Sequence, residues 1–128
     1  YFTDTFTNKI MRQSLSKEGW PKNKPEIFID MTKERINPDG SVIDAEGCLW
    51  NAQWGAGKCS RYNSQGNFLE EIILPVSQIT CPSFGGEDFK TLYVSSASVG
   101  LESPEKLAGS VFELSTKYKG QIEHQVIL

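Results

Sequence analysis

Short runs of aromatic and branched side chains, each followed by small polar residues, recur along the chain. Three of these runs look alike and lie at Tyr1–Thr5, Leu49–Gln53 and Leu92–Ser96. Aromatic and β-branched residues favour extended backbone because they pack well on a pleated surface. The pattern predicts three equivalent β-strands that recur about every 45 residues, a spacing typical of repeat architectures.

Each of these runs is followed by two more candidate strands, and two of the runs are preceded by another. The first following strand is predicted at Lys9–Gln13, Lys58–Tyr62 and Ser110–Leu114, and the second at Glu26–Ile29, Phe68–Leu74 and Gln125–Leu128. The preceding strand is predicted at Ile36–Ile43 and Thr80–Phe84. Turn sequences such as Ser64–Asn67 separate the strands. The repeated unit therefore has four strands.

A repeat of this length with four strands is typical of a β-propeller blade. We therefore predict an all-β fold and a partial propeller with about two and a half four-stranded blades. Residues 1–30 are expected to form a partial blade, residues 31–76 a full blade and residues 77–128 the last blade. A single β-sandwich of about ten strands would have similar spacing and is the alternative.

Composition limits the classes of function. The chain has 128 residues, which is the size of one domain, and a formal net charge of -3. This charge removes the electrostatic reason for binding nucleic acid or an anionic membrane, and no apolar run approaches the roughly 18 residues that span a bilayer. A small polar metabolite or a protein is the more plausible partner.

The cysteines give an expectation about the compartment. Cys48, Cys59 and Cys81 are odd in number and lack CxxC spacing. This usage argues against a disulfide framework and against a structural zinc site. A cytoplasmic location, with three free thiols, is therefore expected.

The segment Asn37–Trp50 holds the main candidate for chemistry. Asp39 lies between Pro38 and Gly40, a sequence that predicts a tight loop before a short strand. A carboxylate fixed by a loop at the mouth of a β-scaffold can serve as a metal ligand or as a catalytic base. The structural alternative is that Asp39 only caps its own turn. Asp44 and Glu46 are expected to face solvent at the tip of the next turn.

An ordered set of motifs covers nearly the whole chain. The set is Tyr1–Thr5, Asn37–Gly40, Asp44–Gly47, Leu49–Trp50, Ile73–Val76, Thr80–Gly86 and Leu92–Ala97. In this order it resembles the C-terminal part of the senescence-marker protein, regucalcin and gluconolactonase family. The resemblance implies a six-bladed propeller, one divalent cation (Ca, Zn or Mg) at the mouth of its channel, and hydrolysis of sugar lactones.

The resemblance also implies a metal-ligand set. The family holds its cation with a glutamate near the N-terminus, an asparagine in a middle blade and the aspartate of the Pro-Asp-Gly segment. Of these three ligands, Asp39 alone has a counterpart in this chain, and we expect it to bind metal and to accept a proton from water. The other two would lie upstream of Tyr1, so the chain is expected to be a C-terminal fragment of a lactonase and nearly inactive alone.

Two alternatives to the lactonase function remain open. One is a non-catalytic propeller that acts as a binding scaffold, and the other is a related six-bladed hydrolase that acts on a different ester. In each case a partial ring would leave apolar sheet faces at both ends. We therefore expect a homo-oligomer, in which two copies complete a ring of about six blades.

Overall fold

The computed structural model describes residues 1–122, which form ten β-strands and one short 3-10 helix. The first sheet contains β1 (Phe2–Asp4), β2 (Lys9–Leu15) and β3 (Pro21–Asp30), with the 3-10 helix η1 (Thr5–Thr7) after β1. The second contains β4 (Asn37–Ile43), β5 (Leu49–Trp54), β6 (Lys58–Tyr62) and β7 (Phe68–Ile73). The third contains β8 (Ile79–Gly85), β9 (Thr91–Ser96) and β10 (Val111–Ser115).

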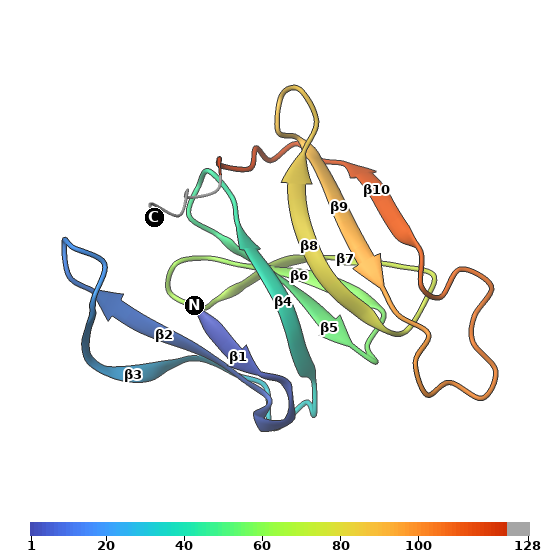
Figure 1. The fold of residues 1–128 in the computed structure, drawn as a ribbon, viewed down its shortest axis with the longest axis horizontal. Helices are drawn as coiled ribbons and strands as arrows, with labels where there is room; N and C mark the ends of the chain where they lie inside the picture. The colour runs from blue at the N-terminus through green and yellow to red at the C-terminus, as the bar shows by residue number, and fades with distance from the viewer. Residues whose placement is uncertain (123–128) are drawn as a thin grey trace.

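Every sheet is antiparallel, and within it each strand pairs with the next strand of the chain (Figure 1). The prediction of an all-β chain is confirmed, and the expected strands lie close to the observed ones. The strand predicted at Gln125–Leu128 lies outside the described residues. In residues 1–122, no helix is long and apolar enough to cross a membrane.

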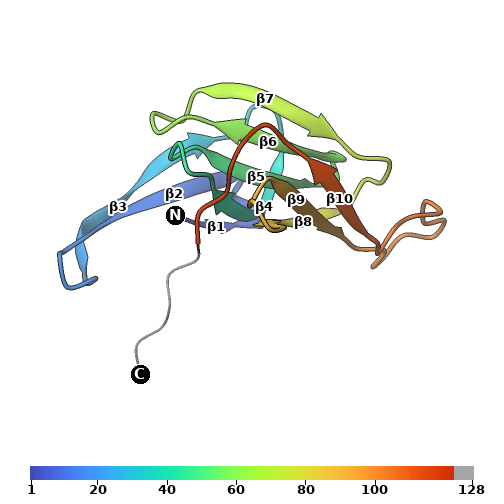
Figure 2. The same cartoon turned by 90° about the horizontal axis from the view of Figure 1, so that it is seen from above.

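The three sheets pack face to face through two apolar clusters. One cluster lies between the first and second sheets and includes Ile10, Met31 and Leu49, and the other lies between the second and third sheets and includes Trp50 and Val94. Leu49 and Trp50 are neighbours on β5 and are each 1% exposed. Because successive side chains on a strand point to opposite faces, β5 contributes to both clusters. Figure 2 shows the middle sheet between the other two.

The first strand of the middle sheet, β4, brings the sheets together at one side. It contacts β1 of the first sheet and β8 of the third, and the three strands lie at the centre of Figure 1. The other strands of each sheet extend away from this centre. Residues on β4 are therefore placed where all three sheets meet.

The prediction that Asp44 faces solvent is wrong, because its side chain is 0% exposed. Its carboxylate accepts hydrogen bonds from the indole N–H of Trp50 at 3.0 Å and from Nε of Arg61 at 2.8 Å. Gly120, in the segment after β10, also pairs with Asp44 through an isolated backbone bridge. These contacts bury Asp44 as the partner of a buried arginine. Glu46 does face solvent, with 66% of its side chain exposed.

Candidate functional site

Asp39 lies on a β-bulge within β4. The strand predicted at Ile36–Ile43 is confirmed, and the tight loop predicted at Pro38–Gly40 is wrong. Pro38 pairs with Gln53, and the next pair is Ser41 with Asn51. Asp39 and Gly40 therefore stand opposite one residue of β5, the arrangement of a bulge. A bulge interrupts the ladder of hydrogen bonds and re-aims a side chain. The extra residue gives Asp39 a direction that a regular strand would not.

A buried amide supports the bulge from the neighbouring strand. Asn51 on β5 is 0% exposed. Its Nδ2 donates to the carbonyl oxygen of Asp39 at 2.9 Å and to Oγ of Ser41 at 3.0 Å, and it lies 3.4 Å from the carbonyl of Gly40. A carbonyl that loses its ladder partner needs another donor when it is buried. Asn51 supplies that donor and fixes the backbone of Asp39.

Gly40 allows the bulge to approach the third sheet. A Cβ at this position would lie 2.7 Å from the carbonyl oxygen of Thr80 and 2.7 Å from Sγ of Cys81. Both neighbours belong to β8, and the backbone of Thr80 cannot yield as a flexible side chain could. Glycine is therefore required by the close packing of β4 on β8, and this packing holds the bulge from the side opposite β1.

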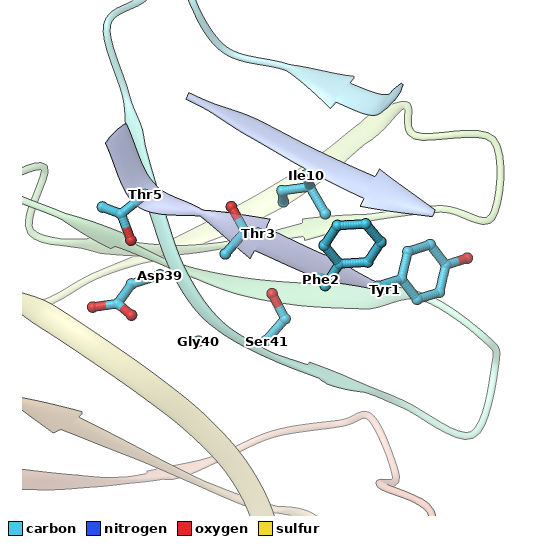
Figure 3. A pocket seen from close by; sticks show the side chains of 8 residues that line it. All are labelled: Tyr1, Phe2, Thr3, Thr5, Ile10, Asp39, Gly40 and Ser41. Atoms are coloured by element: carbon cyan, nitrogen blue, oxygen red, sulfur yellow. The ribbon is translucent and has the colours of Figure 1, made fainter. Parts of the chain in front are cut away.

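Asp39 lies at one end of a pocket of about 290 Å³ between β1 and β4 (Figure 3). The pocket is lined by Tyr1, Phe2, Thr3, Thr5, Ile10, Asp39, Gly40 and Ser41. Asp39 is half-buried, and burial raises the pKa of its carboxyl above the ordinary value, partly offset by the backbone N–H of Gly40. Asp39 makes no ion pair with the described residues. A partly desolvated carboxylate without a cation can bind a cation or accept a proton.

A second pocket, of about 310 Å³, also reaches Asp39. It is lined by Thr5, Phe6, Asn37, Asp39 and Trp54. Phe6 extends from η1 and is 94% exposed, whereas Trp54 stands opposite Asn37 across β4 and β5. Asp39 is thus the single acidic side chain that lines either pocket, and it belongs to both.

Residues 1–122 do not supply a complete set of metal-ligating side chains around Asp39. The described part of the chain contains no group of three or more His, Cys, Asp or Glu side chains that could hold a metal ion. The Asp39 carboxylate is nevertheless a hard oxygen donor without a cationic partner, and it fits the preference of a hard divalent cation for oxygen. These residues could supply one ligand and would need others to complete a site.

Sequence reasoning singled out Asp39 but missed the groups that position it. Asn51 reads as one polar residue in a strand, and nothing in its local sequence shows that it faces a bulge. Sequence reasoning also missed Asn8, because its hydrogen-bond partner Asn37 lies 29 residues away in the chain. The signal that could have found Asn51 is the polar residue within the apolar run Leu49–Ala52, because a fully buried strand position takes an amide only when it has a partner.

The chain is similar in sequence to a known protein family and to several lactonases. A model of the family described as "SMP-30/Gluconolactonase/LRE-like region" matches residues 1–98. The chain is 35% identical to an L-arabinolactonase from Azospirillum brasilense, over 94% of this chain and 40% of the relative. It is 32% identical to a 6-deoxy-6-sulfogluconolactonase from Pseudomonas putida, over 96% of this chain and 44% of the relative.

A solved structure has the same arrangement of strands. The calcium-binding protein regucalcin from Agrobacterium tumefaciens superposes with a TM-score of 0.92 and 41% identity, over 100% of this chain and 45% of that one. The predicted partial propeller is thereby confirmed, and the chain spans less than half the length of these relatives. By its sequence match and its fold, the chain belongs to the SMP-30/gluconolactonase/LRE-like family.

Proposed function

We propose that this chain forms part of a metal-dependent sugar-lactone hydrolase, in which Asp39 is a metal ligand and the proton acceptor. The observation that carries the proposal is the position of Asp39, a half-buried carboxylate without a cationic partner in two adjoining pockets. Support also comes from the family and from relatives whose names describe lactonases. A neighbour described as calcium-binding supports the divalent cation.

The chain's own groups suit the hydrolysis of a cyclic ester. When bound, a divalent cation polarises a carbonyl and lowers the pKa of water. The Asp39 carboxylate can hold the attacking water by accepting a hydrogen bond, and it can take up a proton as the tetrahedral adduct forms. The bulge, Asn51 and the close packing of Gly40 fix the backbone that carries this carboxylate. A fixed base lowers the entropic cost of reaching the reactive geometry.

The test uses the full-length protein that contains these residues. Sugar-lactone hydrolysis is measured in metal-free buffer and after addition of calcium, zinc or magnesium, for the wild type, Asp39→Asn and Asp39→Ala. We expect metal-dependent turnover in the wild type and a loss of at least about 100-fold in both variants, the scale for removing a group that acts in the transition state. Glu87→Gln, in the exposed loop after β8, is the control. Unchanged turnover in Asp39→Ala would remove Asp39 from the mechanism.

Expressed by itself, the 128-residue chain is expected to be nearly inactive and to self-associate. One carboxylate holds a divalent ion weakly. Apolar side chains are exposed at both ends of the stack of sheets, with Phe2 49% and Val111 64% exposed. Pairing of two copies would cover this surface. Sedimentation of residues 1–128 tests this expectation, and a monomer over a wide concentration range would contradict it.

A further inference from the structure

The side chain of Asn8 is fixed beside the second pocket. Asn8 follows η1 in the left-handed conformation, with φ 56°, and its carbonyl accepts a hydrogen bond from the backbone N–H of Met31 at 2.8 Å. Its Nδ2 donates to the carbonyl oxygen of Ile36 at 2.7 Å and to Oδ1 of Asn37 at 2.8 Å. Both amide hydrogens of Asn8 are thus used to hold β4 at its first residue.

These two hydrogen bonds determine which way the amide of Asn37 points. The carbonyl of Ile36 can only accept, so the atom of Asn8 that faces it is nitrogen. The same nitrogen faces Asn37, so the facing atom of Asn37 must be its oxygen. The Nδ2 group of Asn37 is therefore turned away from Asn8, and it makes no hydrogen bond to another described residue. Asn37 is left with two oriented donor hydrogens.

The free donor belongs to the pocket that also contains Asp39. Asn37 and Asp39 both lie on β4, Asn37 at its first residue and Asp39 on the bulge. They line the second pocket together with Thr5 and with the aromatic side chains of Phe6 and Trp54. No lysine or arginine lines this pocket. An oriented amide, a hydroxyl and two aromatic rings suit a neutral, hydroxylated molecule, since polar groups fix orientation and apolar walls bury carbon.

We propose that Asn37 is a specificity-determining residue that donates a hydrogen bond from Nδ2 to one hydroxyl oxygen of the substrate, with Asn8 as the residue that positions it. The second pocket then takes the uncharged, hydroxylated part of a sugar lactone, while Asp39 acts at the ester. This inference rests on the proposed lactonase function. It adds a substrate contact made by this chain and a reason for the position of Asn8.

The test compares variants of the full-length protein on related lactones. Asn37→Ala removes the donor, and Asn37→Asp keeps the oxygen that accepts from Asn8 while replacing the donor by an acceptor. Asn8→Ala releases the amide of Asn37. Asn63→Ala is the control, because Asn63 caps the turn between β6 and β7 and lies outside both pockets. The substrates are gluconolactone and a series of gluconolactones that each lack one hydroxyl group.

We expect Asn37→Ala and Asn37→Asp to lower kcat/KM for gluconolactone by about 3- to 10-fold, the worth of one neutral hydrogen bond. For one deoxygenated lactone, wild type and variants should have the same kcat/KM, because the partner of Asn37 is missing. Asn8→Ala should show the same selective loss in weaker form, and Asn63→Ala no selective loss. An equal loss on every lactone, or no loss, would overturn the inference.

A binding measurement separates this inference from the proposed function. Gluconolactam, a neutral analogue that resists hydrolysis, is titrated calorimetrically into wild type and Asn37→Ala. Weaker binding by the variant, in a protein that hydrolyses no lactone, would contradict the proposed function and support the role of Asn37. Lactone hydrolysis with equal gluconolactam binding by both proteins would overturn the role of Asn37 alone. Absence of both hydrolysis and binding would overturn both.

Discussion

The amide nitrogen of Asn51 lies 2.9 Å from the carbonyl oxygen of Asp39, and this hydrogen bond joins a buried residue of β5 to the bulge that carries the candidate catalytic carboxylate. The same amide also donates to Ser41 on the far side of the bulge. One side chain thus holds the backbone from the carbonyl of Asp39 to Ser41. The direction of the Asp39 side chain depends on a residue that does not line its pocket.

Replacing Asn51 with valine should lower both stability and activity. Valine suits a buried strand but cannot donate, so the carbonyl of Asp39 loses its partner. We expect a loss of about 1–3 kcal/mol in the free energy of unfolding, the cost of an unpaired buried carbonyl. Displacement of Asp39 should lower kcat for lactone hydrolysis by the full-length protein by about 10-fold or more.

The matched control for Asn51→Val is Ser60→Ala. Ser60 is buried on β6 directly opposite Asn51, but it does not contact β4 through a hydrogen bond. Urea unfolding and steady-state kinetics are measured for both variants. Equal kcat in wild type and Asn51→Val would show that the bulge keeps its shape without this amide.

Gly40→Ala should destabilise the protein and impair the site. The new Cβ would lie 2.7 Å from the carbonyl oxygen of Thr80, so β4 and β8 must move apart. Overpacking of this kind costs about 1–3 kcal/mol, read as a lower urea midpoint. Gly47→Ala is the control: its positive φ of 78° makes alanine unfavourable, but no atom lies within 4 Å and Asp39 is not touched. Both variants should lose stability, whereas kcat should fall in Gly40→Ala alone.

Asp44→Ala should be among the most destabilising substitutions in the chain. It would remove the carboxylate that lies 2.7 Å from the buried guanidinium of Arg61, whose side chain is 5% exposed. Breaking a buried ion pair on one side costs about 3–5 kcal/mol, because the remaining charge is uncompensated. Glu46→Ala also removes a partner of Arg61, at 2.6 Å, but its side chain is 66% exposed. A surface pair contributes about 0–1 kcal/mol, so a similar loss in both variants would contradict the buried role of Asp44.

Glu105 should make stability depend on pH in the acid range. Its pKa lies below the ordinary value of 4.5, first because its own backbone N–H, and then Ser77, stabilise the carboxylate. A lowered folded pKa means that the stabilisation is present above the unfolded value and is lost as the pH falls through the folded one. Glu105→Gln should therefore be less stable than wild type at neutral pH, and the difference should close as the pH falls below 4.5 and through the folded pKa.

Urea midpoints across this pH range measure the effect of Glu105, with Glu102→Gln, an exposed position in the same loop, as the control. The backbone N–H of Ser77 donates to the Glu105 carboxylate at 2.9 Å, so the loop should also loosen as the pH falls. A stability difference that stays constant from neutral to acid pH would show that ionisation of Glu105 does not matter.

Much of the fold could be predicted from the sequence because each strand is encoded by neighbouring residues. Runs such as Leu49–Gln53 carry their preference for extended backbone locally, and their recurrence indicates the repeat. The ordered motifs indicated the family, and Pro38-Asp39-Gly40 indicated the candidate carboxylate. These features do not depend on how one sheet lies against the next.

The tertiary structure decided how that carboxylate is held. The bulge at Asp39 depends on the register between β4 and β5, which placed Asn51 against it. The burial of Asp44 depends on Arg61, and the orientation of Asn37 depends on Asn8, in the turn between η1 and β2. These partners are 12, 17 and 29 residues apart in the chain. A local pattern can predict a strand, but hydrogen bonds between distant residues form only when register and sheet packing bring donor and acceptor together.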